Sequence, residues 1–385
     1  MSATQLVYLD HNATAPLLPE VWEALQAVAP RCQGNPSSPH RAGREARAVL
    51  EDARRRIAAE VGVPPQSLCF TSGGSESNNA VLRQFAESAN PVHLVVSAVE
   101  HPSVLETART LAQRPNLSIT ELPVNAQGLV SPESLAAALR PETTLVSVMS
   151  ANNETGALQP LTELVRICQA RGVRFHTDAT QVFGKLPVDW SGVDFATATA
   201  HKLGGPRGIG LLYVRPGTSF VPQITGGRQE RVRRAGTEND WLAHGFAEAV
   251  AWHSRHREQM QAQWAGFRKR LLDGLQDVDG FFLNSPDAGF CLAHTLNFGF
   301  RGLSGESLVI ALDLEGIAVS TGSACSSGAL EASPVLLAQG RNRKDAKASL
   351  RISFGAATTA ADVALLLTRL RHHVRRLHSK RTSKP

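Results

Sequence analysis

The alternation of short apolar runs with amphipathic helical stretches most strongly constrains the fold of this chain. Five runs are predicted to be strands: His93–Val99, Thr144–Ala151, Val173–Asp178, Asp194–Thr199 and Gly210–Val214. Helical patterns are found at Ala42–Val61, Ser131–Arg140 and Thr162–Arg171. Strands that alternate with helices predict a mostly parallel sheet with helices on both faces, which is the α/β class.

The pattern changes after about residue 215. A long polar helical stretch, Trp241–Val278, is followed by the strand-like run His294–Phe300 and the helical pattern Gly305–Leu314. Two more strand-like runs come after it, Ile317–Ser320 and Ser349–Ser353. This order predicts a second, smaller α+β domain. No Pro- or Ser-rich linker separates the two parts, so we expect them to pack closely.

The composition is that of a soluble globular protein, with 42% hydrophobic and 19% charged residues in 385. No run approaches the ~20 apolar residues of a membrane span, and the first ten residues lack the pattern of a secretory signal. Five cysteines without a C-x-x-C pair argue against a disulfide framework or a metal site. The sequence therefore predicts a protein of the reducing cytoplasm.

The net charge of +6 is a property of the C-terminal tail. Residues 369–385 carry seven lysines and arginines and no acidic residue; without them, 33 basic residues face 34 acidic ones. We interpret the tail as a solvated, frayed end that follows a helix with the apolar face Leu366, Leu370, Val374 and Leu377. An acidic partner is the alternative, and direct contact with nucleic acid is not expected.

Polar residues follow four of the predicted strands where each one ends. They are His101, the Asn152–Asn153 pair, Asp178 and Lys202. Because ligands of open parallel sheets bind outside the carboxyl ends of the strands, these side chains are predicted to share one site.

A glycine-rich segment, Cys69–Asn79, joins a strand end to a helix rich in hydroxyl groups. Its glycines allow close approach of an anion to the free amides of the helix N-terminus, and Ser75 can add a hydroxyl contact. A plain N-cap by Ser72 or Ser75 is the alternative. No nucleotide triphosphate loop is present, so a single phosphate is the better prediction.

Asp178 and Lys202 suggest an aldehyde cofactor. A carboxylate at the end of an apolar strand needs a partner, and a protonated pyridine nitrogen would supply one. Gln181 could reach the phenolic oxygen of the same ring, and Lys202 could hold the aldehyde as a Schiff base. A surface lysine is the alternative reading of Lys202.

Cys325 lies in Thr321-Gly-Ser-Ala-Cys-Ser-Ser-Gly328. Small residues leave the thiol little apolar surface to pack against, which favours a cysteine that travels to a substrate over a structural cysteine in a turn. The other four cysteines lie in helical or strand-like patterns and are predicted to be core residues; they are Cys32, Cys69, Cys168 and Cys291.

These motifs together resemble those of the cysteine desulfurases, which are class V aminotransferase-like enzymes dependent on pyridoxal 5'-phosphate (PLP). The resemblance runs in order from about Tyr8 to Thr359 and includes long segments: 34–40, 70–79, 100–101, 152–156, 176–181, 201–202, 226–239, 320–328 and 349–355. The Ser-Ala-Cys-Ser-Ser context resembles the group with a long mobile cysteine loop.

The resemblance implies the PLP transferase fold of type I and a homodimer. A large PLP-binding domain would span residues 15–255, and a small domain residues 1–14 and 256–385. The cofactor would be bound by Lys202, Asp178, Gln181, His101, Gly74, Ser75, Asn153, Thr199 and His201, and by Thr237 from the neighbouring subunit. The substrate carboxylate would be bound by Arg351, Asn153 and Asn12.

The implied reaction converts L-cysteine to L-alanine. Lys202 would remove the Cα proton, His101 or Lys202 would return a proton, and Cys325 would take the sulfur as a persulfide. The sulfur acceptor would be a protein of iron–sulfur cluster assembly or of tRNA or DNA thio-modification. A selenocysteine lyase or an aminotransferase of the same fold is the alternative.

The chain departs from the family pattern at Ser75 and Thr199, where one hydroxyl residue replaces another, and more clearly at two other places. Arg228 stands where relatives commonly have glycine, and Ala356-Ala357 stand where an arginine often follows Gly355. Neither change removes a predicted catalytic group; Arg228 bears on the choice of partner.

Overall fold

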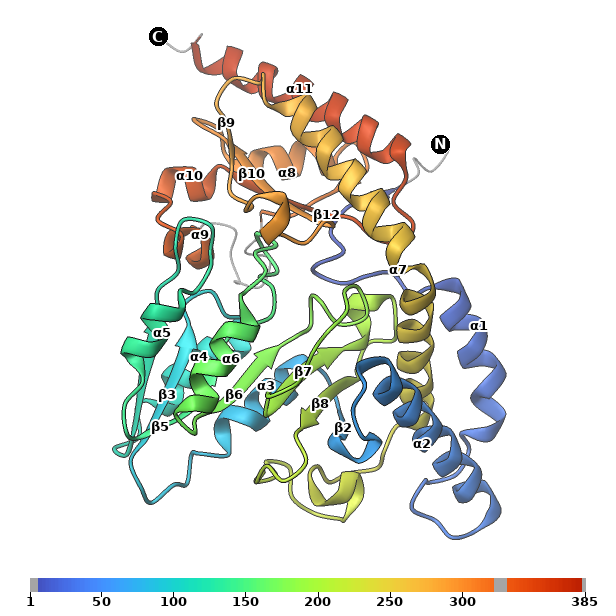
Figure 1. The fold of residues 1–385 in the computed structure, drawn as a ribbon. Coiled ribbons are helices and arrows are strands. Elements are labelled where there is room, and N and C mark those ends of the chain that lie inside the picture. Colours follow the sequence, from blue (N-terminus) through green and yellow to red (C-terminus); the bar gives the residue numbers. More distant parts are fainter. Residues whose placement is uncertain (1–5, 322–330, 383–385) are drawn as a thin grey trace.

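A seven-stranded sheet forms the centre of the molecule (Figure 1). The structure is a computed structural model and describes residues 6–321 and 331–382. The strand order is β2-β8-β7-β6-β5-β3-β4, with these bounds: β2 (Leu68–Thr71), β3 (Val92–Ser97), β4 (Leu117–Leu122), β5 (Thr143–Ser147), β6 (Arg174–Asp178), β7 (Phe195–Thr199) and β8 (Gly210–Val214). The two pairings of β8, with β2 and with β7, are antiparallel, and the other four pairings of this sheet are parallel, so the predicted, mostly parallel sheet is confirmed.

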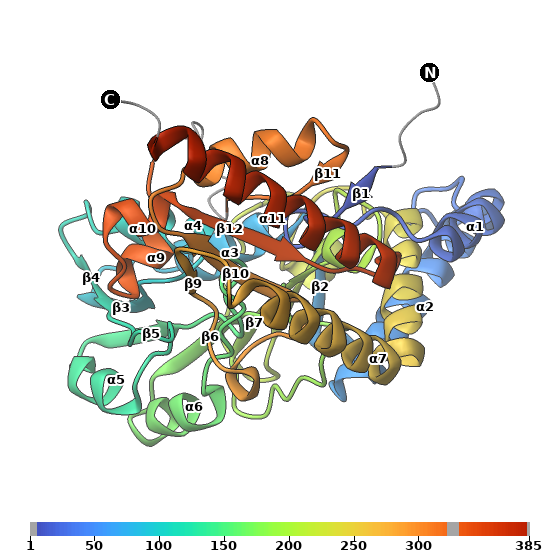
Figure 2. The ribbon, with the colours of Figure 1, turned by 90° about the horizontal axis from the view of Figure 1, so that it is seen from above.

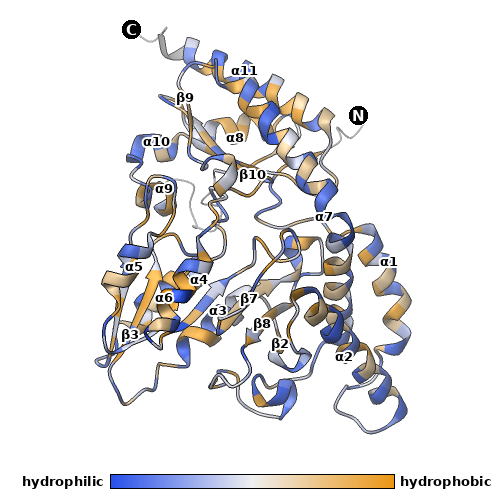
Figure 3. Cartoon of the chain, viewed as in Figure 1, coloured by the Kyte–Doolittle hydropathy of each residue, from blue (hydrophilic) through white to orange (hydrophobic). Residues whose placement is uncertain are grey.

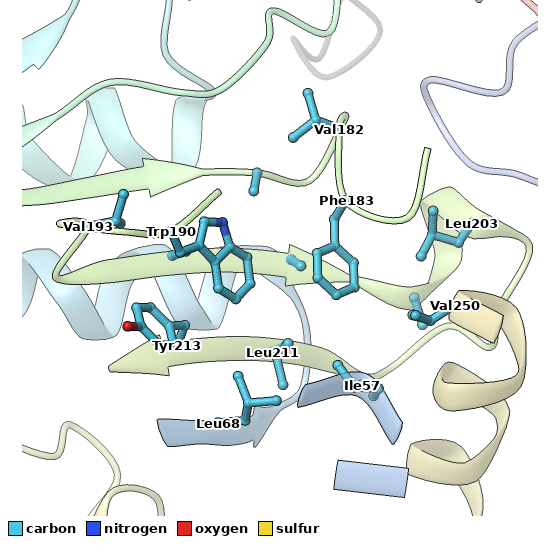
Figure 4. Close-up of a cluster of buried hydrophobic side chains, with 14 of the residues drawn as sticks. Ile57, Leu68, Val182, Phe183, Trp190, Val193, Leu203, Leu211, Tyr213 and Val250 are labelled. Atoms are coloured by element: carbon cyan, nitrogen blue, oxygen red, sulfur yellow. The ribbon is translucent and has the colours of Figure 1, made fainter. Parts of the chain in front are cut away.

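Helices cover both faces of this sheet, as the sequence predicted. They are α1 (Pro19–Val28), α2 (Arg41–Val61), α3 (Gly74–Arg83), α4 (Pro102–Leu111), α5 (Pro132–Ala138) and α6 (Leu161–Ala170). Neighbouring residues of β3 point to opposite faces: Leu94 packs in the core with α3 and α4, whereas Val95 packs in the core with α2 and α6. Figure 4 shows part of the core that contains Val95, α2 and α6; in it, Trp190 lies beside Phe183 and Tyr213.

A second, smaller sheet lies above the first (Figure 1). Its three antiparallel strands, in the order β12-β10-β9, are β9 (Phe281–Leu283), β10 (Thr295–Phe300) and β12 (Ser349–Ser353). Beside it, β1 (Val7–Tyr8) pairs in parallel with β11 (Ile317–Ala318). Its helices are α8 (Gly305–Asp313), α9 (Pro334–Ala338), α10 (Arg343–Lys347) and α11 (Ala360–Thr382).

One helix, α7 (Asp240–Leu275), belongs to both cores. Phe246 and Val250 in its first half pack with α1 and α2, whereas Trp264 and Leu271 in its second half pack against the smaller sheet. The predicted domain boundary at residues 255 and 256 falls inside this continuous helix. The division into two domains stays a prediction.

Residues 369–382 of the basic tail form part of α11. Leu366, Leu370 and Val374 are buried and Leu377 is half-buried against the same core, so the predicted apolar face is confirmed. The helix continues to Thr382, however, and six of the seven basic residues lie on it instead of following it as a frayed end; Lys384 lies outside the described residues. Figure 3 shows orange and blue residues interleaved along α11, and Figure 2 shows that it lies beside α7. Arg371 pairs with Asp277 at 2.5 Å.

The prediction of four core cysteines is correct for three. Cys69, Cys168 and Cys291 are buried, but Cys32 is half-buried. It follows the short 3-10 turn Ala29–Arg31, so the helical pattern ends before it. Among the helices that the structure describes, none is long and apolar enough to cross a membrane.

A buried ion pair fixes the segment before α7. The guanidinium of Arg54 on α2 donates two hydrogen bonds to the carboxylate of Glu230, at 2.7 and 2.8 Å, and neither side chain is more than 2% exposed. The same carboxylate accepts the backbone N–H of Phe70 at 3.0 Å. Glu230, Arg231 and Val232 all have positive φ values, so this bonding holds a backbone conformation that these residues otherwise avoid.

We therefore expect Arg54→Met to lower the free energy of unfolding by about 3–5 kcal/mol, because it leaves the Glu230 carboxylate buried without its cation. Adding Glu230→Gln should restore most of the loss. Arg55, which is 61% exposed on the same helix, gives the control Arg55→Met, with an expected loss below about 1 kcal/mol. Equilibrium chemical denaturation followed by circular dichroism measures all three; equal losses for Arg54→Met and Arg55→Met would contradict the expectation.

Candidate active site

The predicted site residues surround one cavity of about 300 Å³ at the carboxyl ends of the central strands. β6 ends at Asp178, and the turn Ala200–Leu203 follows β7. Eleven of the predicted residues line the cavity: Asn12, Gly74, Ser75, His101, Asn153, Asp178, Gln181, Thr199, His201, Lys202 and Arg351. Thr237 is exposed and does not line it. Cys325 lies outside the described residues.

The Asp178 carboxylate lines the cavity and accepts two hydrogen bonds. Its side chain accepts the backbone N–H of Thr180 at 2.9 Å and the amide of Asn78 at 2.7 Å. The residue is 6% exposed. A buried carboxylate with two neutral donors is suited to a cationic partner, such as a protonated ring nitrogen.

Lys202 lines the cavity from the turn that follows β7. Its ammonium donates to the backbone oxygens of Asn12 and Ala13, at 2.5 and 2.7 Å. Both carbonyls lie in the segment between β1 and α1, which connects the smaller sheet to the larger one. Lys202 is therefore hydrogen-bonded to this connecting segment. An amine at this position can react with a carbonyl group bound in the cavity.

The N-terminus of α3 supplies the predicted anion site. Gly74 and Ser75 line the cavity, where the first amides of the helix have no partner within the helix. His201 contacts the Thr14 hydroxyl at 3.1 Å, and burial lowers the pKa of His201 to about 4. The Thr199 hydroxyl donates to the Ile209 carbonyl at 3.1 Å, so in this state its proton does not face the cavity.

Among the described residues that line the cavity, Arg351 is the only arginine. Its guanidinium donates to the Asp10 carboxylate at 2.6 Å and to the Asn153 carbonyl at 3.2 Å, and its side chain is 2% exposed. Asn12 donates to the same Asn153 carbonyl at 3.0 Å. A substrate carboxylate at this position would share the guanidinium with Asp10.

The cavity accommodates a polar ligand such as PLP. Among the described residues, five buried polar atoms of its lining lack a hydrogen-bond partner: Asn12 Oδ1, Asn78 Oδ1, Thr180 Oγ1, Gln181 Oε1 and Arg351 Nε. Buried polar groups are rarely left unpaired in folded proteins, so these atoms indicate a bound partner. Together with a carboxylate, a lysine and a helix N-terminus, they fit the ring and the phosphate of PLP.

Sequence reasoning missed several polar residues of the site. Asn78 and Ser103 line the cavity and link Asp178 to His101. A signal for Asn78 existed, because it lies four residues after Gly74 and so faces the same side of α3. Ser103 lies two residues after His101, in the first turn of α4.

A second cavity of about 80 Å³ shares Lys202 with the first, and Lys185 lines it. Lys185 is 4% exposed, and its Nζ lies 3.4 Å from His294 Nε2. Burial, with a smaller contribution from the charge of Lys202, lowers the pKa of Lys185 to about 7. His11 and His253 line the same cavity, and burial lowers their pKa values as well, to about 4 and 3.

The comparisons with known proteins agree with this fold. The family model described as aminotransferase class-V matches residues 7–366. The cysteine desulfurase IscS of Dictyoglomus turgidum is 41% identical over 97% of this chain and 95% of its own length. The IscS-like cysteine desulfurase of Mycobacterium tuberculosis is 40% identical, over 93% of each chain. A solved NifS-like protein has a TM-score of 0.90 and 32% identity, and the match covers 96% of this chain and all of that one.

The chain therefore belongs to the class V aminotransferase family, with the type I fold of that family. Within the family it belongs with the cysteine desulfurases, as its full-length relatives show. The resemblance seen in the sequence is confirmed.

The buried Lys185 should make stability depend on pH. The unfolded chain keeps this amine protonated up to about pH 10, whereas the folded chain releases the proton near pH 7. The unfolded state thus binds more protons between about pH 7 and 10, and stability rises with pH in this window. Lys185→Met should be more stable than the original chain at pH 6, on the order of a few kcal/mol, with the gain shrinking toward pH 10.

Chemical denaturation of the two apoproteins at several pH values measures this difference. Lys347→Met, on the exposed side of α10, is the control and should show no such dependence. A gain for Lys185→Met that does not change with pH would contradict the expected titration.

Proposed function

We propose that this protein is a PLP-dependent cysteine desulfurase that converts L-cysteine to L-alanine and carries the sulfur as a persulfide on Cys325. The observation that carries the proposal is that Asp178, Lys202 and Arg351 line one and the same cavity. Relatives named cysteine desulfurase, aligned over nearly the whole chain, support the choice of substrate.

PLP would be bound by residues from several strand ends. Asp178 would pair with the ring nitrogen, Gln181 with the phenolic oxygen, and His101 would lie on the ring face. The phosphate would lie at the N-terminus of α3 beside Gly74, Ser75, Thr199 and His201. When bound, PLP withdraws electrons from the Cα of an attached amino acid, so that a proton can leave that carbon.

Lys202 would act as the general base. Its amine would take the Cα proton once it no longer bonds the Asn12 and Ala13 carbonyls, because an amine that donates to two acceptors as an ammonium cannot accept a proton. Arg351 would orient the substrate by its carboxylate, with Asn12 and Asn153 beside it. The bidentate geometry of a guanidinium suits this role.

Cys325 would then attack the substrate sulfur as a thiolate. The new S–S bond forms as the C–S bond of the substrate breaks, and the electron pair of that bond stays with the carbon skeleton. The skeleton takes up protons and leaves as L-alanine, and the outer sulfur of the persulfide passes to an acceptor protein. We propose iron–sulfur cluster assembly or thio-modification of tRNA or DNA as the destination.

A homodimer would complete the site. Thr237 is exposed on its own chain, which suits a contact with the phosphate bound by a second copy. Arg234, three residues earlier, pairs with Glu76 of α3 at 2.9 Å, so the segment lies close to the helix that forms the anion site. We also propose a cytoplasmic location, because persulfide chemistry requires reduced cysteines.

Cys325→Ser should abolish the release of L-alanine from L-cysteine, at least a hundredfold, while the visible absorbance of bound PLP stays unchanged, since the variant loses the sulfur nucleophile alone. Alanine is quantified after incubation of the reconstituted enzyme with L-cysteine. Cys32→Ser, at a half-buried cysteine outside the cavity, is the matched control. Normal alanine release by Cys325→Ser would refute the proposed role.

A further inference from the structure

The two ring nitrogens of His101 have different surroundings. His101 is the N-cap of α4, and its Nδ1 accepts the backbone N–H of Ser103 at 3.1 Å. A backbone N–H can only donate, so Nδ1 must present its lone pair. A neutral ring in this position therefore carries its proton on Nε2.

The Ser103 hydroxyl reinforces this assignment. Its oxygen lies 2.8 Å from the same Nδ1 and accepts a hydrogen bond from the Asn78 amide at 2.9 Å. Because Nδ1 presents its lone pair, the hydroxyl is the donor in this contact, while its oxygen accepts from Asn78. The lone pair of this nitrogen thus faces two donors of one residue.

The orientation of the Asn78 amide is set by Asp178. The nitrogen of the amide lies 2.7 Å from a carboxylate oxygen, which can only accept. Turning the amide over would place two oxygens at this distance, so the nitrogen must face both Asp178 and Ser103. Asn78 is 1% exposed and has no freedom to reorient through solvent. One amide therefore connects Asp178 to His101.

The neutral state of His101 is favoured by its surroundings. Burial lowers the pKa of His101; Asp178 on β6 opposes this shift, and Lys202 after β7 adds to it. Protonation of Nδ1 would also place an N–H against the Ser103 N–H and remove the cap of α4. Within the described residues Nε2 makes no hydrogen bond, and His101 lines the cavity. Its N–H is available to a bound molecule.

We propose that Ser103 and Asn78 are positioning residues that hold His101 as the Nε2–H tautomer, so that His101 offers the cavity a proton donor and not a base. This inference rests on the proposed function, because it assigns roles in that reaction. It leaves removal of the Cα proton to Lys202 and gives His101 the return of a proton or a hydrogen bond to a developing negative charge.

The tautomer can be observed directly by NMR of the protein labelled with ¹⁵N-histidine. Correlations between the ring carbon-bound protons and the ring nitrogens distinguish the two tautomers and the imidazolium, and loss of a signal set in His101→Gln assigns His101. We expect a protonated Nε2 and an unprotonated Nδ1 at pH 7, with and without PLP. A protonated Nδ1, or an imidazolium, at pH 7 would overturn the proposal.

Ser103→Ala tests the positioning role. Loss of the hydroxyl donor makes Nδ1 more basic. Because protonation of Nδ1 breaks the contact with the Ser103 N–H that holds the ring in place, the acid limb of kcat/KM for alanine formation should move up by about one pH unit, the worth of one hydrogen bond. The NMR titration of His101 should move by the same amount. Ser103→Thr keeps a hydroxyl and should restore both, and Asn78→Ala should shift both in the direction of Ser103→Ala.

Ser134→Ala is the matched control, because Ser134 also lies in the first turn of a helix, α5, away from the cavity. It should leave both profiles unchanged. An unshifted profile in Ser103→Ala would refute the positioning role. The NMR result needs no substrate, so a failure of the desulfurase proposal, seen as no alanine from the original enzyme, remains distinct from a failure of this inference.

Discussion

The pairing of β6 with β7 is the constraint on which the site depends. The two strands run parallel, with Asp178 opposite Thr197, so their carboxyl ends meet at one edge of the sheet. Asp178 is the last residue of β6, and Lys202 lies three residues beyond the end of β7. A carboxylate and an amine are therefore placed around one cavity by backbone hydrogen bonds alone. The remaining site residues adjust the charge and orientation of these two groups.

The sequence predicted those parts of the molecule that depend on local pattern. Strand ends located Asp178, Lys202 and His101, because periodicity shows where a buried strand stops and the strand-end rule shows where its next residues lie. The helix α2 was predicted to within one residue, since Gly62 adopts a left-handed conformation and ends it. The same reasoning predicted the strands of the smaller sheet. It did not predict that the boundary between the two parts lies within one continuous helix, α7.

What the sequence alone could not supply are contacts between distant segments. Arg351 and Asp10 are 341 residues apart, and Lys185 and His294 are 109 apart. No period or spacing connects them; the role of Arg351 came from the family resemblance and that of Asp10 from the structure. Asn78 and Ser103 are only 25 residues apart, but a polar residue near the start of a helix usually caps that helix. The structure shows that Asn78 also binds Asp178, and this third partner distinguishes a hydrogen-bond network from a simple cap.

The continuity of α7 has a consequence for how the protein unfolds. Its 36 residues contribute buried side chains to both cores without an interruption between them. Because a helix propagates cooperatively, loss of structure in one half withdraws support from the other. Unfolding of one sheet is thus linked to unfolding of the other through α7. The molecule should therefore unfold in one cooperative transition, even though its strands form two separate sheets.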